Sequence, residues 1–399
     1  MMAEQAAVQS KRKICAVLVD RANYGRMHPV MKAIQSDAGL DLQTICAGTM
    51  LLERFGRAER IVAADDFHID GRVYLEVEGS VPATMAKSIG LGIIEFSTEF
   101  QRLNPDIVLI IGDRYETLAA TIAAAYMNLP VAHIQGGEIS GSIDESARHA
   151  ITKFAHLHFA STERSANYIR QMGEHPDYVF NVGCPSGDYI MSLDQHIASE
   201  EVNALGVGGY IDIDKPYFLV IFHPITTEFG LQRQQADQLV HALHELQHPT
   251  IWLWPNIDAG SNGIAVALRV FREKHQATWL HMIKTLDPVT FQKLLKRATC
   301  AIGNSSSFIR DSTFSGTPVI LVGDRQVGRE HGENLISCPP RATEILQAIR
   351  KQREIGRRPP TNLYGDGNAG LKIVKALKTF QPYTQKRLYY PFANDNIDC

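Results

Sequence analysis

Short runs of β-branched and other aliphatic residues recur along this chain, and stretches with helical character lie between them. In the first half, such runs begin at Ile14, Ile107, Val131 and Val179, and an alanine-rich segment at residues 115–128 separates the middle two. Apolar runs of this length are typical of strands buried on both faces, and an intervening helix allows neighbouring strands to run parallel. The first half therefore predicts a parallel sheet covered by helices.

The same alternation restarts in the second half, with apolar runs that begin at Phe218, Ile251, Thr278, Cys300 and Pro318. Between the halves, residues 205–215 are rich in glycine and acidic residues, which is a composition typical of a domain linker. We predict an α/β protein with two Rossmann-like doubly wound domains that face a cleft. The predicted domains are residues 12–204 and 205–378, and a tail at 379–399 could cross back to the first domain.

Charge and cysteine usage exclude several classes of partner. The 40 basic and 43 acidic residues nearly cancel, so no single-signed field is expected to attract nucleic acid or a lipid surface. The six cysteines form no CxxC pair or regular spacing, which argues against a disulfide framework and against a zinc site. No apolar run has the length of a signal or of a membrane span. We expect a cytoplasmic protein that acts on a small molecule without a metal or another cofactor.

Polar residues that directly follow the apolar runs are the first candidates for a site, because open parallel sheets bind ligands beyond the carboxyl ends of their strands. Asp113 and Arg114 follow the run that begins at Ile107. An arginine suits phosphate binding, and an aspartate held nearby could transfer a proton. A helix cap with a surface ion pair is the alternative interpretation of these two residues.

A second cluster follows the run that begins at Val131. It starts with His133 and Gln135, includes a pair of glycines, and continues with Glu138, Asp144, Glu145, Arg148 and His149. Paired glycines let a ligand approach the backbone, and the later residues fall within one or two turns of a helix. Acidic capping of that helix would explain Asp144 but neither Glu138 nor His133. The sequence therefore predicts that acids and histidines converge at this strand end.

The serine run at residues 303–307, GNSSS, gives the strongest local signal in the second half. Small residues at the start of a helix expose N–H groups and hydroxyls that can hold a diphosphate, although serine is also a common helix cap. The run matches neither the Walker A loop nor the GxGxxG pattern. Polar residues also follow the neighbouring runs, namely His223, Asn256, Arg325 and Arg329.

Taken in order, these segments resemble the hydrolysing UDP-N-acetylglucosamine 2-epimerases, a family that includes bacterial enzymes of sialic-acid pathways and the epimerase half of the animal bifunctional epimerase/kinase. The likeness runs from about Ile14 to about Tyr390. It is carried by RANYGRMHPVM, GDRYETLA, HIQGGEISGSIDESARHAITK, VGCPSGD, HPITTE, PNIDAGS, IGNSSSFIRD, GTPVILVGDRQVGRE and YGDGNA.

The resemblance implies a glycosyltransferase-B-like pair of domains, with UDP held mainly by the second, in a homodimer or homotetramer. The residues that would bind UDP or the sugar are Arg21, Arg114, His133, Gln135, Asn256, Leu286, Ser305, Ser306, Asp311 and Arg325. Asp113 and Asp144 fall on positions implicated in proton transfer. Glu138 and His149 belong to the same cluster, and His223 would lie beside the diphosphate.

Three positions depart from the family pattern. Gln135 stands where the animal enzyme has a glutamate considered catalytic, and an amide cannot act as a general base. Asp311 is shorter than the glutamate that grips the ribose, which leaves space for a water molecule. Asn262, Val266 and Thr285 replace basic residues that bind CMP-sialic acid in the animal enzyme, so we do not expect inhibition by that nucleotide.

The resemblance implies hydrolysis of UDP-N-acetylglucosamine to UDP and N-acetylmannosamine through a 2-acetamidoglucal, in sialic-acid-type nonulosonic acid biosynthesis. Three alternatives stay open: a non-hydrolysing 2-epimerase, a glycosyltransferase of the same fold and a catalytically silent sugar-nucleotide sensor. The non-hydrolysing enzymes have an EAGLR-like stretch where this chain has QGGEISGS. The sequence does not distinguish UDP-N-acetylglucosamine from a 2,4-diacetamido-trideoxy sugar nucleotide or a GDP-linked form.

Overall fold

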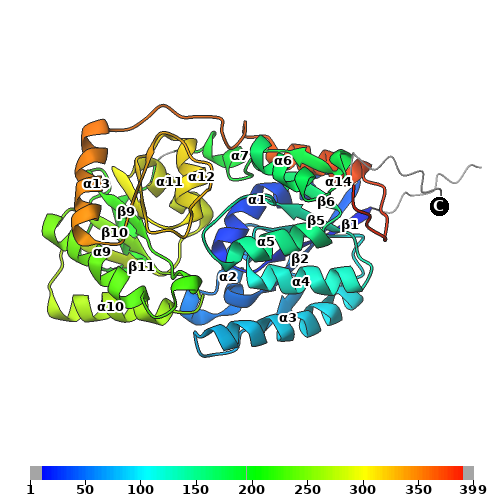
Figure 1. Cartoon of the computed structure of the whole chain (residues 1–399), viewed down its shortest axis with the longest axis horizontal. Coiled ribbons are helices and arrows are strands. Elements are labelled where there is room, and N and C mark those ends of the chain that lie inside the picture. The colour runs from blue at the N-terminus through cyan, green and yellow to red at the C-terminus, as the bar shows by residue number, and fades with distance from the viewer. Residues whose placement is uncertain (1–10, 195, 390–399) are drawn as a thin grey trace, which may run out of the picture.

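Two seven-stranded sheets organise the protein, as the computed structural model in Figure 1 shows for residues 11–194 and 196–389. The first sheet is parallel throughout and has the order β3-β2-β1-β4-β5-β6-β7. Its strands are β1 (Arg12–Leu18), β2 (Leu40–Ala47), β3 (Gly71–Val73), β4 (Ile107–Ile111), β5 (Val131–Ile134), β6 (Leu157–Ala160) and β7 (Val179–Asn181).

Helices cover both faces of this first sheet. Residues of α1 (Arg21–Ser36), α2 (Glu59–Ala64) and α14 (Ala369–Thr379) pack on one face. Residues of α3 (Pro82–Leu103), α4 (Tyr115–Tyr126) and α5 (Ile143–Phe154) pack on the other. The helices α6 (Glu163–Gln171) and α7 (Gly187–Ile190) follow in the chain. Because the central strands are buried on both faces, they consist of continuous apolar runs rather than alternating ones.

The second sheet has the order β14-β13-β12-β9-β10-β11-β8, and only its edge strand β8 runs antiparallel. Its strands are β8 (Gly206–Gly208), β9 (Phe218–Ile221), β10 (Thr250–Leu253), β11 (Leu280–Ile283), β12 (Cys300–Gly303), β13 (Val319–Val322) and β14 (Leu335–Cys338). One face packs against α9 (Gln232–Leu246), α10 (Ser261–Lys274) and α13 (Ala342–Ile355). The other packs against α8 (Ser199–Ala204), α11 (Pro288–Arg297) and α12 (Ser306–Thr313).

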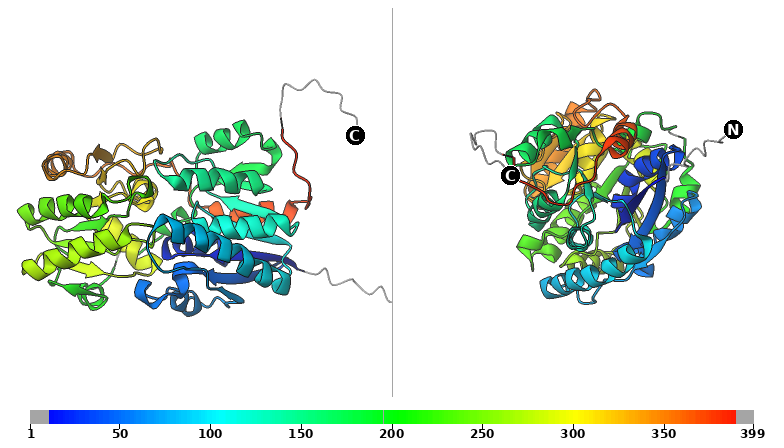
Figure 2. Two further views of the ribbon diagram at one scale, coloured as in Figure 1. Left: turned by 60° about the horizontal axis from the view of Figure 1, so that its bottom comes forward. Right: turned by 90° about the vertical axis from the view of Figure 1, so that its right-hand side faces the viewer.

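Two facing, doubly wound α/β lobes confirm the predicted fold class (Figure 2). Each sheet has its own hydrophobic core on both faces, so each lobe is a separate packing unit. Four short 3₁₀ turns complete the described elements, at Gly48–Leu51, Glu53–Phe55, Pro176–Tyr178 and Thr226–Glu228.

The segment predicted as a linker, residues 205–215, lies inside the second lobe. Its strand β8 pairs with β11, and Ile211 and Ile213 are buried in the core beneath that sheet. Val202 of α8 joins the same core, so the chain enters the second lobe before residue 199, earlier than the predicted boundary at 204. The sequence GVG of β8 carries no apolar pattern, because an edge strand pairs through its backbone and buries few side chains.

The chain returns to the first lobe through α14, and not only through the tail after residue 378 as predicted. In Figure 1 the chain runs from α13 along the top of the molecule to α14, which lies against α1. Ile373 and Leu377 of α14 are fully buried in the core of the first sheet. Residues 390–399 of the predicted tail lie outside the described residues.

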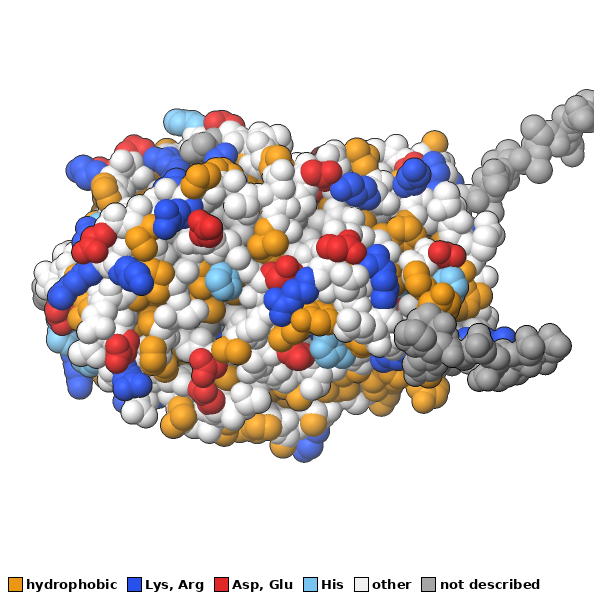
Figure 3. Space-filling view, turned by 45° about the horizontal axis from the view of Figure 1, so that its top comes forward, with side chains coloured by type: hydrophobic (Ala, Val, Ile, Leu, Met, Phe, Trp, Pro, Cys, Tyr) orange, Lys and Arg blue, Asp and Glu red, His pale blue; other side chains and the backbone are white. Residues whose placement is uncertain are grey.

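Basic and acidic side chains are interspersed over the face drawn in Figure 3. This mixture agrees with the near balance of 40 basic and 43 acidic residues. Among the helices of residues 11–194 and 196–389, none combines the length and the hydropathy needed to cross a membrane.

Candidate active site

A cleft of about 1220 Å³, partly open to solvent, lies between the carboxyl ends of the two sheets. Its walls are the segments that follow β1, β2 and β4 in the first lobe and β9 to β13 in the second. Ligands of doubly wound sheets bind at this edge. Ten predicted site residues line the cleft: Arg21, Asp113, Arg114, His223, Asn256, Leu286, Ser305, Ser306, Asp311 and Arg325.

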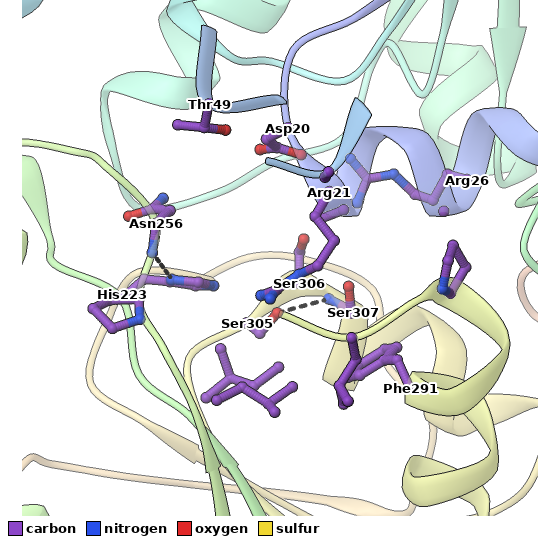
Figure 4. A pocket seen from close by; sticks show the side chains of 18 of the residues that line it. Asp20, Arg21, Arg26, Thr49, His223, Asn256, Phe291, Ser305, Ser306 and Ser307 are labelled. Atoms are coloured by element: carbon purple, nitrogen blue, oxygen red, sulfur yellow. Dashed lines mark hydrogen bonds between the residues drawn. The ribbon is translucent and has the colours of Figure 1, made fainter. Parts of the chain in front are cut away.

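The amino end of α12 forms the floor of the cleft on the second lobe. Ser305 caps this helix, since its hydroxyl accepts a hydrogen bond from the Ser307 backbone N–H at 3.4 Å. Gly303 precedes it with a φ of 140°, and a Cβ there would lie 1.8 Å from the Ile221 carbonyl oxygen, so only glycine fits. The helix dipole, the first N–H groups and the serine hydroxyls together favour an anion at this point. In Figure 4 the side chain of Arg21 extends from α1 toward Ser305 and Ser306.

His223 lies beside these serines as a neutral hydrogen-bond donor. Its Nδ1 accepts a hydrogen bond from the Asn256 backbone N–H at 3.1 Å, so the ring hydrogen resides on Nε2. Burial, together with the charges of Arg325 and Arg21, holds the pKa of His223 well below its usual value. Asn304 fixes the backbone of His223, because its side chain accepts from the His223 N–H at 2.7 Å and donates to the His223 carbonyl at 2.8 Å.

Asp113 lines the cleft, whereas Asp144 lies outside the lining residues and reaches the cleft only through its hydrogen bond with Arg325; the two carboxylates have opposite pKa shifts. Burial acts to raise the pKa of Asp113, but the guanidinium groups of Arg148 and Arg329 outweigh it and hold this pKa well below its usual range. Arg148 also donates a hydrogen bond to the Asp113 carboxylate. Burial raises the pKa of Asp144 to about 6, and the negative charge of Asp113 adds to the effect, although Arg325 donates to Asp144 at 2.9 Å. Carboxylates with separated pKa values are typical of acid–base sites.

Two of the predicted phosphate-binding arginines already have carboxylate partners. Arg114 donates to Glu116 at 2.8 Å and to Asp258, and Asp20 lies 3.5 Å from its Nε. Arg325 is bonded to Asp144. Much of the charge of Arg114 is therefore neutralised within the protein, which leaves it less able to bind a phosphate than its position in the sequence suggests.

Glu138 lies outside the residues that line the cleft. Its side chain is 3% exposed, accepts a hydrogen bond from Arg310 at 2.8 Å and forms an ion pair with Arg329. Both arginines belong to the second lobe, so the carboxylate joins the lobes. A buried carboxylate held by two guanidinium groups of the other lobe, outside the residues that line the cleft, favours a structural role.

His133, Gln135 and His149 also lie outside the residues that line the cleft. His133 is fully buried; its Nε2 donates to the Gly112 carbonyl at 2.8 Å, which leaves Nδ1 to accept from the Thr152 hydroxyl at 3.2 Å. It thereby supports the turn before Asp113. Gln135 is buried against Cys184, with 3.2 Å from its Nε2 to the thiol sulfur. His149 lies 3.6 Å from Glu145 on a half-buried face of α5.

Comparison with known proteins places this arrangement in a family. The family model described as UDP-N-acetylglucosamine 2-epimerase matches residues 32–378. The chain belongs to the UDP-N-acetylglucosamine 2-epimerase family.

Curated relatives agree with the family match. The UDP-N,N'-diacetylbacillosamine 2-epimerase (hydrolyzing) of Legionella pneumophila is 33% identical over 94% of this chain and 97% of its own length. The UDP-N-acetylglucosamine 2-epimerase of Neisseria meningitidis is 30% identical over 94% of this chain and 98% of its own length. Among solved structures, the S. aureus MnaA–UDP co-structure aligns with a TM-score of 0.74 at 18% identity and covers 95% of this chain and 100% of that chain. These findings confirm the predicted family and the glycosyltransferase-B-like fold.

One group of cleft residues, from β11 onward, is apolar. Leu286, Pro288 and Phe291 line it, beside the carboxylate of Asp311. That carboxylate accepts hydrogen bonds from the Ser186 hydroxyl at 2.7 Å and from the Gln292 amide at 2.6 Å. The sequence predicted space for a water molecule beside the short Asp311 side chain; the Ser186 hydroxyl and the Gln292 amide reach that carboxylate instead.

Several residues that line the cleft were not singled out from the sequence. Examples are Asp20, Arg26, Thr49, Tyr189 and Phe291. Asp20 and Thr49 follow β1 and β2 directly, so the rule that ligands bind beyond strand ends could have found them. Within residues 11–194 and 196–389, the structure contains no group of three or more His, Cys, Asp or Glu side chains placed to hold a metal ion.

Proposed function

We propose that this protein is a hydrolysing sugar-nucleotide 2-epimerase, which converts UDP-N-acetylglucosamine to UDP and N-acetylmannosamine. The observation that carries the proposal is that Asp113 lines the same cleft as the anion site at Ser305 and Ser306, and that its pKa and the pKa of Asp144, which is bonded to the cleft residue Arg325, are shifted in opposite directions. The reaction needs this combination: proton transfer at C2 of the sugar and stabilisation of a leaving diphosphate at C1.

In the proposed mechanism, Asp144 is the general base. A carboxylate with a pKa near 6 is a far better match to proton abstraction near neutral pH than Asp113, which the arginines keep ionised. Asp144 removes the C2 proton while the C1–O bond to the diphosphate breaks, which gives UDP and a 2-acetamidoglucal. Ser305, Ser306 and the Nε2–H of His223 stabilise the negative charge on the departing phosphate.

The second half of the reaction occurs on the other face of the ring. Asp113 orients a water molecule whose oxygen adds to C1, and it relays the proton of that water to C2. Carbon 2 is thereby inverted, and one water molecule is consumed for each UDP released. The negative charge of Asp113 also stabilises positive charge that develops at C1.

Hydrolysis is supported by the sequence QGGEISGS, which differs from the EAGLR-like stretch of the non-hydrolysing enzymes, and by the name of the Legionella relative. The direct test is to incubate the purified protein with UDP-N-acetylglucosamine in deuterated water. We expect free UDP and N-acetylmannosamine that carries one deuteron at C2. Formation of UDP-N-acetylmannosamine would contradict the hydrolytic assignment, and UDP release only with an added sugar acceptor would indicate a glycosyltransferase.

The relatives also support a second substrate. The Legionella relative is named for diacetylbacillosamine and is 33% identical, against 30% for the N-acetylglucosamine enzyme of Neisseria. A 2,4-diacetamido-trideoxy sugar nucleotide undergoes the same bond changes at C1 and C2. Comparison of kcat/KM for the two UDP-sugars decides between them, and the larger value identifies the substrate of a sialic-acid-type or a legionaminic-type pathway.

We predict that kcat/KM falls about tenfold per pH unit below about pH 6 and is level above it. The base must be ionised in the free enzyme, and burial raises the pKa of Asp144 to about 6. Activity is therefore lost as the pH falls through this value. The measurement is the pH profile of UDP release at low substrate concentration, where the phosphates of the substrate stay ionised throughout. An activity that rises as the pH falls through 6 would reverse the role of Asp144.

A further inference from the structure

Arg26 is a buried cation of the cleft whose role neither the sequence motifs nor the proposed mechanism explains. It lines the cleft from α1, its residue is 7% exposed, and its Nε has no hydrogen-bond partner. In the part of the chain that the structure describes, no carboxylate lies within ion-pair distance of Arg26. Arg114 and Arg325 line the same cleft but are paired with acidic side chains.

The surroundings of Arg26 increase the free-energy cost of burying its positive charge. Burial lowers the pKa of Arg26, and the neighbouring Arg310 guanidinium lowers it further; the carboxylates of Asp20 and Asp113 act in the opposite direction but do not outweigh these effects. Neither carboxylate forms an ion pair with Arg26, because Asp113 is paired with Arg148 and Asp20 lies beside Arg114. A buried guanidinium without a counter-ion destabilises the folded protein, so its retention in a cleft indicates that a ligand supplies the negative charge.

The position of Arg26 identifies which part of a ligand it faces. A Cβ built on Gly112 would lie 3.5 Å from the Arg26 Nη2, so the guanidinium adjoins the turn that carries Asp113. On its other side, Arg310 donates to the Ser306 hydroxyl at 2.8 Å. Figure 4 shows Arg26 extending from α1 into the cavity opposite the serines. Arg26 therefore lies between the carboxylate proposed to act at the sugar ring and the anion site of α12.

We propose that Arg26 binds the phosphate attached to C1 of the sugar, the β-phosphate of a nucleoside diphosphate. This inference rests on the proposed function, because it assumes that the sugar lies at Asp113. The β-phosphate is the anionic group one bond away from C1, and it gains charge as the C1–O bond breaks. A guanidinium with no other partner can form a bidentate contact with it. Arg26 then takes the role that the sequence assigned to Arg114.

The test is to measure the affinity of UDP, UMP and uridine for the wild-type protein and for Arg26→Met and Arg26→Lys by calorimetry. The matched control is Arg60→Met, which removes a 63% exposed arginine of the same lobe. We expect Arg26→Met to weaken UDP binding by about 10²-fold, the scale of a lost charge-assisted contact, and UMP and uridine binding by less than about threefold. Arg26→Lys should restore part of the UDP affinity, and Arg60→Met should bind all three ligands like the wild type.

Thermal unfolding without ligand provides the second readout. Because the buried Arg26 forms no ion pair among the described residues, Arg26→Met should unfold at the same or a higher temperature than the wild type. Equal losses of UDP and UMP affinity, unchanged UDP affinity, or a lower unfolding temperature in Arg26→Met would each overturn the proposal. If the wild type binds UDP no more tightly than it binds UMP and uridine, the β-phosphate contact is absent. If it binds none of the three, the proposed function itself fails.

Discussion

Asp144→Asn is expected to lower the rate of UDP release by about 10²–10⁴-fold, the usual effect of removing one acid–base group. An amide cannot accept the C2 proton, while it keeps the size of the aspartate and its hydrogen bond from Arg325, which spans 2.9 Å in the wild type. The measurement is the single-turnover rate of UDP release with saturating enzyme. Circular dichroism and UDP binding should match the wild type.

Asp113→Asn provides the matched comparison, because the proposed mechanism separates the two carboxylates. This variant should lose sugar formation by a similar factor yet still release UDP, so that 2-acetamidoglucal accumulates. Wild-type sugar formation by Asp113→Asn would remove Asp113 from the mechanism. Glucal accumulation by Asp144→Asn instead of Asp113→Asn would exchange their roles.

Glu138→Gln is expected to lower the free energy of unfolding by about 3–5 kcal/mol, the scale for removing one partner of a buried ion pair. The Glu138 carboxylate is 3% exposed, and its loss leaves the Arg310 and Arg329 guanidinium groups without their counter-ion between the lobes. Urea unfolding followed by intrinsic fluorescence measures the change, with each lobe's transition fitted separately because a two-lobed protein need not unfold in one step.

Glu163→Gln is the control for this effect. Glu163 forms an ion pair with Arg170 at 2.8 Å, but its side chain is 61% exposed, so the expected change is below about 1 kcal/mol. If Glu138→Gln unfolds like the wild type but loses turnover, Glu138 has a catalytic role and its enclosure by arginines is not its main function.

The fold was accessible from the sequence because its strands are buried on both faces. Continuous apolar runs such as Ile107–Ile111 and Val319–Val322 coincide with observed strands. The strand β8 escaped prediction because it is three residues long and contributes backbone rather than side chains. The packing of α14 on the first sheet was not predicted, because an amphipathic helix does not specify which of two similar sheets it covers.

The sequence predicted which residues line the candidate site better than it predicted which side chains form ion pairs with them. Strand ends identify which side chains reach the cleft, and ten of the predicted residues do line it. The ion pairs that decide their chemistry join residues far apart in the chain: Glu138 and Arg310 are 172 positions apart, and Asp144 and Arg325 are 181 apart. No local pattern encodes such pairs. The sequence therefore could not separate the enclosed Glu138 from Asp113, which lines the cleft, or from Asp144, which is bonded to the cleft residue Arg325.

The close approach of Gly141 in the first lobe to Asp324 in the second bears on how tightly the two lobes close. A Cβ on Gly141 would lie 2.0 Å from the Asp324 carbonyl oxygen, and the Gly141 N–H donates to the Arg325 carbonyl at 2.9 Å. A side chain at residue 141 would clash with the backbone of residue 324 and hold the two lobes apart at this edge of the cleft. Because a closed site retains a reaction intermediate and an open one loses it to bulk water, we expect Gly141→Ala to release the glucal of the proposed mechanism before water is added to it.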